Sequence, residues 1–297
     1  MRNIFLKEHA EMVPFFKEAS LKGDYVLVNV DAHADMGMFL NGKLDIGNFI
    51  TYCVKEKYFS KILWIKDDNS IEFEDGFYEF NMFWDDELLR WKCDLEHFGY
   101  FLEDSFVSKE EYSNTNFRMH DYAPNEQAKF YGLASIQLEV ISEKNLAKSR
   151  FAGLNWVLSI DCDFFSAANP FKSEFTKVIN EIGQLRATEL VNKVLKIKTY
   201  SQWIDFKKEL AVSKEWQNAS NLARYAHIET DYDEQEIDKK ILNVLSFLKN
   251  NFAREKCLAA LTCLSFFSGY TPRKKCPKIV SIIDTVFKNF DFFWENA

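Results

Sequence analysis

The stretch YVLVNVDAHADM at residues 25–36 decides the fold. It opens with a nearly continuous run of apolar and β-branched residues, Tyr25 to Val30, which is typical of a strand buried on both faces of a sheet. A second run, WVLSI at residues 156–160, has the same character and also ends in acidic residues. The two runs therefore predict two buried strands, each followed by a polar loop.

Further strand and helix patterns alternate along the chain. Strands are expected over residues 61–65, 135–141 and 258–267, and helices over residues 10–20, 47–57, 173–195, 202–223 and 233–251. Because such alternation requires right-handed crossovers, we expect an α/β fold with three α/β/α layers and a mainly parallel sheet.

The chain lacks a linker rich in Pro, Gly or Ser, so we expect a single domain over residues 1–297. Residues 67–125 are acidic and aromatic without a clean period, which predicts an irregular insertion that contains a hairpin. This insertion is expected to cover an edge of the sheet, with a substrate-contacting surface as the alternative.

Composition limits the classes of function. Hydrophobic residues make up 47% of the chain and charged residues 28%, so it can build a core. A net charge of -8 argues against a nucleic-acid partner, because phosphate binding needs a basic face. The first residues do not form a secretory signal, and no apolar run approaches the ~18 residues that a membrane helix needs. We therefore expect a cytoplasmic protein without a membrane partner, whose six scattered cysteines are reduced and packed.

Metal-ligand residues follow both buried runs. Asp31, His33 and Asp35 alternate after the first run, and Asp161 and Asp163 alternate after the second. In an extended backbone alternate side chains share a face, and open α/β sheets place their sites at the carboxyl ends of the strands. We therefore expect these five side chains to converge.

Four converging carboxylates would repel one another and take up protons unless cations compensate them. Two divalent cations would balance the four charges, and oxygen and imidazole ligands favour Mn²⁺ or a similar divalent metal over a thiolate zinc site. Two such metals ~3.5–4 Å apart can activate a shared water, which predicts metal-assisted hydrolysis. Either motif alone could be a surface acidic cluster, but the pair favours the metal.

The motifs Asp31-Ala-His33-Ala-Asp35 and Ser159-Ile-Asp161-Cys-Asp163 resemble the signatures of the arginase/ureohydrolase superfamily. Together with Glu8-His9, Asn169-Pro170 and Gly269-Tyr270-Thr271-Pro272, they make the chain most similar to the peptide arginase family. Members of that family convert arginine residues of peptides to ornithine and release urea. The resemblance implies an arginase-like fold and a metal-dependent hydrolase that acts on an arginine-containing peptide or a small guanidino compound.

The resemblance also implies roles for individual residues. His9 and Asp35 would hold one Mn²⁺, His33 and Asp163 the other, and Asp31 and Asp161 both. Asp163 and His33 would be catalytic, with Asp163 orienting the nucleophile. Without the resemblance, His9 is simply a helix-start or packing residue. Substrate contacts would come from Asn48, Tyr270 and Thr271, although Asn48 could equally cap a helix and Gly-Tyr-Thr-Pro could be a turn.

Several family features are missing from the sequence. No histidine proton shuttle stands in DIGNFI at residues 45–50, although His120 could be a displaced one, and no glutamate matches the guanidinium ligand of arginases. Free arginine is therefore not the expected substrate. Glu229, Asp231 and Asp233 could pair with a guanidinium, but they precede a predicted helix whose dipole they would stabilise.

Other functions stay open. The chain contains no His-His pair of the kind that single-zinc deacetylases of this fold use, which favours two metals. The first alternative is a hydrolase of another amidine or amide C–N bond, similar to agmatinases or deacetylases. The second is a non-catalytic metal-containing protein that binds a basic peptide. A Mg²⁺ phosphoryl-transfer site is disfavoured by His33 and by the absence of a Gly-rich phosphate loop. A homo-oligomer is allowed.

Overall fold

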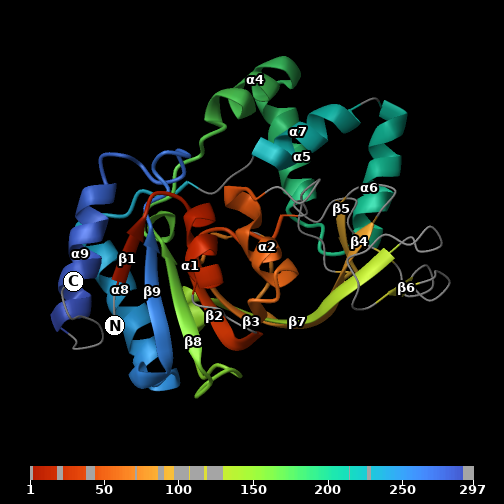
Figure 1. Ribbon diagram of the computed structural model, residues 1–297. Coiled ribbons are helices and arrows are strands. Elements are labelled where there is room, and N and C mark those ends of the chain that lie inside the picture. The colour runs from red at the N-terminus through yellow and green to blue at the C-terminus, as the bar shows by residue number, and fades with distance from the viewer. Residues whose placement is uncertain are drawn as a thin grey trace.

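The computed structural model describes residues 3–18, 23–37, 44–70, 72–85, 90–96, 107, 117–118, 130–213, 215–225 and 229–289. These residues fold around a mixed, mainly parallel sheet (Figure 1). Its strands follow the order β1 (Asn3–Leu6), β9 (Cys257–Cys263), β8 (Trp156–Asp161), β2 (Gly23–Asp31), β3 (Phe59–Lys66), β7 (Phe130–Ser142), β4 (Gly76–Asp85) and β5 (Arg90–Cys93). The pairings from β1 to β7 are parallel, those of β4 are antiparallel, and β6 (Phe117–Arg118) pairs with β7 beside this path.

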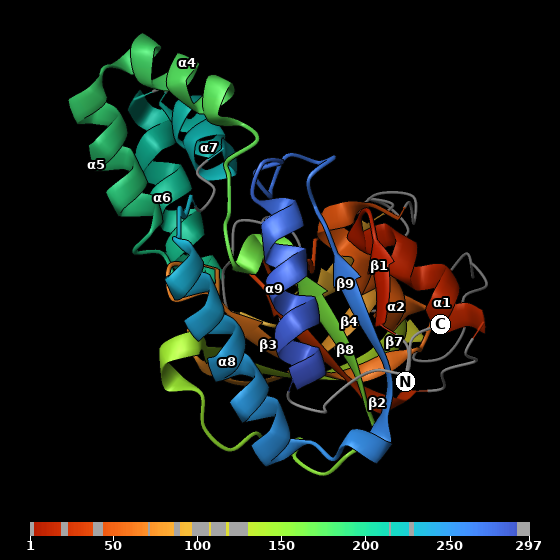
Figure 2. The same ribbon diagram turned by 90° about the vertical axis from the view of Figure 1, so that its left-hand side faces the viewer.

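Helices cover both faces of the sheet (Figure 2). Val26, Val28 and Val30 of β2 lie in the core that α8 (Glu234–Asn251) and α9 (Cys276–Asn289) close. Leu27 faces the opposite core, which α1 (Met12–Glu18) and α2 (Phe49–Lys55) close. Because both sides of β2 are buried, its sequence is a continuous apolar run rather than an alternating one. The predicted α/β class with a mainly parallel sheet is confirmed, and the arrangement is compatible with three α/β/α layers.

Four helices form a separate group between β8 and α8 in the chain. They are α4 (Lys172–Ile182), α5 (Gln184–Val194), α6 (Tyr200–Ser213) and α7 (Trp216–Tyr225). They pack around their own core, which includes the buried Trp203, and stand together beyond one corner of the sheet (Figures 1 and 2). The single helix predicted over residues 173–195 is wrong, because Gly183 takes a φ of 86° and ends α4. The helix predicted over residues 202–223 is likewise two helices.

Strands replace part of the irregular insertion expected at residues 67–125. β4 and β5 pair antiparallel, which confirms the expected hairpin, and they extend the sheet beyond β7. The alternating aromatic residues suit this structure, since Phe80 and Met82 are buried and the rings of Trp84 and Trp91 meet at 4.9 Å. Residues 76–85 and 90–93 are thus the regular, hairpin part of this segment. His120 lies outside the described residues.

Short 3-10 helices complete the fold: η1 (His9–Glu11), η2 (Ile46–Asn48), η4 (Glu143–Asn145), η5 (Cys162–Phe164) and η6 (Arg254–Lys256). The acidic residues before α8 include its N-cap, Asp233, whose side chain accepts a hydrogen bond from the backbone N–H of Glu236. All six cysteines are buried and free, as expected. Over the described ranges, the chain forms no helix with both the length and the apolar character needed to cross a membrane.

Candidate metal centre

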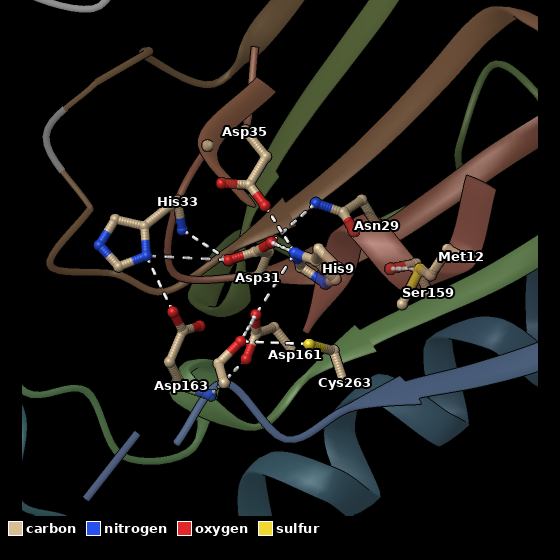
Figure 3. Close-up of polar contacts among 12 residues, drawn as sticks. His9, Met12, Asn29, Asp31, His33, Asp35, Ser159, Asp161, Asp163 and Cys263 are labelled. Atoms are coloured by element: carbon tan, nitrogen blue, oxygen red, sulfur yellow. Dashed lines mark hydrogen bonds and ion pairs between the residues drawn. The ribbon is translucent and has the colours of Figure 1, made fainter. Parts of the chain in front are cut away.

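Four neighbouring strands bring the candidate ligands to one edge of the sheet. β1 leads into η1, which begins at His9, while β2 ends at Asp31 and β8 ends at Asp161. β9 lies between β1 and β8 and ends at Cys263. Because these strands are parallel, their carboxyl ends meet, and the side chains converge there (Figure 3).

The positions of His33 and Asp35 depend on the conformation of a loop rather than on the alternation of side chains along a strand. β2 ends at Asp31, so His33 and Asp35 lie beyond the strand. The backbone N–H of His33 donates to Asp31 Oδ1 at 2.8 Å, and Asp35 takes a φ of 48°. The expected convergence is present, but the reason given for it, one extended face, is wrong. A left-handed aspartate is a local strain of the kind that clusters at functional sites.

His9 faces three carboxylates. Its Nδ1 atom lies 2.5 Å from Asp35 Oδ2, 3.4 Å from Asp161 Oδ2 and 3.5 Å from Asp31 Oδ2 (Figure 3). Asp161 is held in place by Ser265, whose Oγ donates to Asp161 Oδ2 at 2.6 Å. One imidazole nitrogen and three carboxylates are thus gathered around a buried position.

His33 makes the second half of the cluster. Its Nδ1 atom lies 2.9 Å from Asp163 Oδ2 and 3.9 Å from Asp31 Oδ1. Asp163 lies in η5, and its Oδ1 atom accepts a hydrogen bond from the backbone N–H of Ala32 at 3.2 Å. Asp31 therefore lies within 4 Å of both histidines. The structure thus brings His9 beside Asp35 and His33 beside Asp163.

Atoms of these residues lie close enough to share a cation. Within the described part of the chain, three groups have ligand atoms within 4.8 Å of one another. They are His9, Asp31 and Asp35; Asp31, His33 and Asp163; and His9, Asp161 and Cys263. Cys263 was not a predicted ligand, because a lone cysteine at the end of an apolar strand reads as a packing residue.

The protonation of the histidines follows from the surrounding carboxylates. Burial alone would lower the pKa of His9, but Asp161 and Asp35 outweigh it and raise the pKa to about 9. Burial likewise opposes the charged form of His33, and Asp163 raises its pKa to about 10. Protons on both imidazoles therefore compensate the carboxylates at neutral pH.

Fully ionised, the four aspartates would carry more negative charge than two protonated histidines can balance, so some of them hold protons when no cation is bound. Burial and the neighbouring Asp163 raise the pKa of Asp161 to about 7, and burial with Asp35 raises that of Asp31 well above its usual range. Burial also disfavours the charge of Asp163, but His33 outweighs it and lowers the pKa of this carboxyl. A buried cluster of oxygen and imidazole donors, in which carboxylates are held protonated, could hold a metal ion.

A pocket opens over the cluster. Among its lining residues are His9, His33, Asp35, Asp161 and Asp163, together with Glu72, Ser265, Ser268 and Tyr270. The ring of Tyr270, a predicted substrate contact, packs against His33 at 4.9 Å between centroids. Glu72 was not predicted, because an isolated glutamate within an acidic segment carries no sequence signal.

The other two predicted substrate contacts do not line this pocket. The side chain of Asn48 accepts a hydrogen bond from the backbone N–H of Asp45 at 2.7 Å, which closes a capping box before α2. Thr271 is buried, and its backbone N–H donates to the carbonyl of Ser265 at 2.9 Å. Both residues therefore stabilise the backbone near the pocket, and a direct contact of either residue with the substrate stays a prediction.

No protein-family model matches the chain, and no curated protein is significantly similar to it.

Metal binding is expected to release protons at neutral pH. A metal-bound imidazole would be neutral, whereas at pH 7 both imidazoles are protonated, with pKa values of about 9 and about 10. Binding of Mn²⁺ should release more than two protons, because Asp31 and Asp161, whose pKa values are raised by burial, give up theirs as well. Its affinity should rise with pH over the range in which these groups lose their protons. Isothermal titration calorimetry in buffers of different ionisation enthalpy measures this number. Equal binding enthalpies in all buffers would contradict the expectation.

Proposed function

We propose that the chain is a metal-dependent hydrolase that cleaves the guanidinium group of arginine residues in a peptide and gives ornithine and urea. The observation that carries this proposal is the convergence of two histidines and four aspartates, most of them buried, at a pocket that all of them except Asp31 line. The arrangement of His9 with Asp35, and of His33 with Asp163, supports a centre of two cations.

Two Mn²⁺ ions, or divalent cations of the same class, would be held by His9, Asp31, His33, Asp35, Asp161 and Asp163. When bound, they would supply positive charge and an activated water. In the reaction, water adds to the guanidinium carbon, and the bond from this carbon to the side-chain nitrogen breaks. The carbon leaves as urea, and the nitrogen takes up a proton to become the amine of ornithine.

Residues of the chain orient the reacting groups. Asp163 is fixed by the N–H of Ala32 and by the His33 imidazole, so its carboxylate can direct the attacking water. Ser265 fixes Asp161 in the same way through its hydroxyl. Tyr270 packs on His33, and its ring would restrict the access of water to that side of the pocket under the proposed function.

Mass spectrometry tests the proposed function directly. The Mn²⁺-reconstituted protein is incubated with arginine-containing peptides and, in parallel, with free arginine. We expect arginine residues in the peptides to become ornithine, with release of urea, while free arginine is not converted. Absence of conversion by protein that has bound the metal would overturn the proposal and favour another C–N substrate or a peptide-binding role.

A further inference from the structure

An apolar groove lies beside the metal pocket, where β1, the loop after β9 and the start of α9 meet. Its volume is about 400 Å³, and its lining includes Phe5, Leu264, Phe266, Pro277 and Val280 together with the cation Arg273. Side chains at this surface are unusually exposed for their type, since Phe5 is 41% and Phe267 61% exposed. A concave apolar surface that is left open is typical of a contact with a ligand.

One loop separates this groove from the metal pocket. The loop leads from the carboxyl end of β9 to α9 (Figure 2). Ser265 lines the metal pocket, whereas its neighbours Leu264 and Phe266 line the groove. The wall between the two is therefore a single segment of chain. A packed layer is about 10 Å thick, which an extended peptide spans in about three residues. A peptide with its arginine in the metal pocket can thus place a nearby side chain in the groove.

Hydrogen bonds hold this wall in place. The backbone N–H of Leu264 donates to the carbonyl of Leu6 on β1 at 3.0 Å. The backbone N–H of Ser268 donates to Glu8 Oε1 at 2.8 Å. Both contacts join the loop to the segment that contains β1 and His9. Such a surface is pre-organised, because little conformational freedom remains to be lost when a ligand binds.

The charge at the groove is opposite to that of the whole chain. The chain has a net charge of -8, but the segment TPRKKCPK at residues 271–278 contains four cations and no acid. Lys275 and Lys278 are each paired with a carboxylate. Arg273 and Lys274 are exposed, and neither forms an ion pair with the described part of the chain. Two positive charges therefore stay available at the rim of the groove.

The cations stand against the aromatic rings of the loop. The guanidinium of Arg273 lies 5.8 Å from the ring centre of Phe266, and the ammonium of Lys7 lies 5.7 Å from that of Phe267. The two rings stack at 4.1 Å between centroids. An apolar surface bordered by cations suits an apolar side chain that has a carboxylate next to it, because a guanidinium donates charge-assisted hydrogen bonds to a carboxylate.

We propose that this groove is a docking site for the part of the peptide substrate beside the target arginine, and that it selects a large apolar residue next to an acidic one. The apolar side chain would fill the groove, and the carboxylate would pair with Arg273 and Lys274. This inference rests on the proposed function. It assigns the recognition of the surrounding peptide to a surface outside the metal pocket.

Three peptides of equal length test the selection. They are the N-acetyl amides of DFAARAAFD, KFAARAAFK and DAAARAAAD, which differ in the charge or in the apolar residue on both sides of the arginine. Isothermal titration calorimetry with the Mn²⁺-loaded protein measures their affinities, and mass spectrometry follows the formation of ornithine. We expect the first peptide to bind about 10-fold or more tightly than either of the others. The negative net charge of the protein would by itself favour the lysine peptide, so the expected order reports the local charge at the groove.

A charge reversal at the rim identifies the surface. Arg273→Glu should reverse the order of the acidic and lysine peptides and leave Mn²⁺ affinity unchanged, because this exposed side chain lies outside the metal pocket. Arg254→Glu is the matched control, since it makes the same change in an exposed residue before the amino end of β9, and it should keep the wild-type order.

The outcomes separate this inference from the proposed function. Equal affinities and equal conversion of all three peptides would overturn the docking site while the proposed function stands. Preferential binding of the acidic peptide, reversed by Arg273→Glu but without conversion of any peptide, would support the docking site while the proposed function fails. If Arg273→Glu leaves the peptide affinities unchanged and turns a dimer into a monomer in light scattering, the groove is a contact between copies of the chain and the inference is overturned.

Discussion

Replacement of Asp163 by asparagine is expected to lower the turnover of arginine peptides by more than about a hundredfold, because even the residues that only orient metal ligands typically contribute 10- to 100-fold. The carboxylate faces His33 Nδ1 at 2.9 Å and is a candidate ligand, so under the proposed function its charge would serve both to hold the cation and to direct the attacking water. Asparagine has the same shape, and its oxygen can still accept the N–H of Ala32. The fold should therefore survive, and Mn²⁺ affinity should fall together with turnover.

The experiment measures ornithine formation by mass spectrometry and Mn²⁺ affinity by calorimetry on the same preparations. Asp205→Asn is the matched control, because its side chain on α6 is largely exposed and pairs only with Lys208 among the described ion pairs. This control should keep both properties. A variant at position 163 that retains wild-type turnover and affinity would remove Asp163 from the centre. Peptide binding without turnover in the wild-type protein would instead support the non-catalytic alternative.

The central strand of the sheet could be predicted because a continuous apolar run is stable only where both of its faces are buried. The run from Tyr25 to Val30 is apolar on both faces, and β2 is buried by helices on both sides. The helix break at Gly183 was missed because an isolated glycine within a periodic pattern is often tolerated. β1 was missed because four residues at the edge of a sheet carry too little pattern to recognise. α9 did offer a signal, since Ile279, Ile282 and Ile283 repeat at helical spacing and are buried.

The candidate site was predictable in its composition but not in its geometry. Residue types and their position after two buried runs pointed to Asp31, His33, Asp35 and the second pair. The direction in which these side chains point depends on the left-handed backbone of Asp35 and on the 3-10 helix η5. Neither feature could be predicted from the alternation of residues along an extended strand. Glu72 could not have been found at all, because only the packing of its loop against Ala32 and Ala34 brings it to the pocket.

A second prediction concerns a buried cation behind the site. Lys240 of α8 places its ammonium 2.7 Å from Asp67 Oδ2 and 2.5 Å from Glu143 Oε2, and 4.4 Å from the ring centre of Phe164. Phe164 follows Asp163 directly in η5, so the ammonium supports the loop that carries a candidate ligand. Lys240→Met is expected to lower the free energy of unfolding by about 3–5 kcal/mol, because it leaves the carboxylate of Asp67 buried without this cation. Urea denaturation followed by circular dichroism measures the loss.

The loss in the free energy of unfolding should come from the carboxylates that remain buried without a cation rather than from the missing lysine side chain. A double variant distinguishes these two causes. Methionine fills a similar volume, so the double variant Lys240→Met with Asp67→Asn should recover about 1–3 kcal/mol of the loss by removing the buried charge. Lys239, the exposed neighbour on α8, provides the control, and Lys239→Met should change the stability by less than about 0.5 kcal/mol. A loss below about 1 kcal/mol for Lys240→Met would show that this buried cluster contributes no more to stability than an exposed ion pair does. In that case α8 would hold the loop of Asp163 by apolar packing alone.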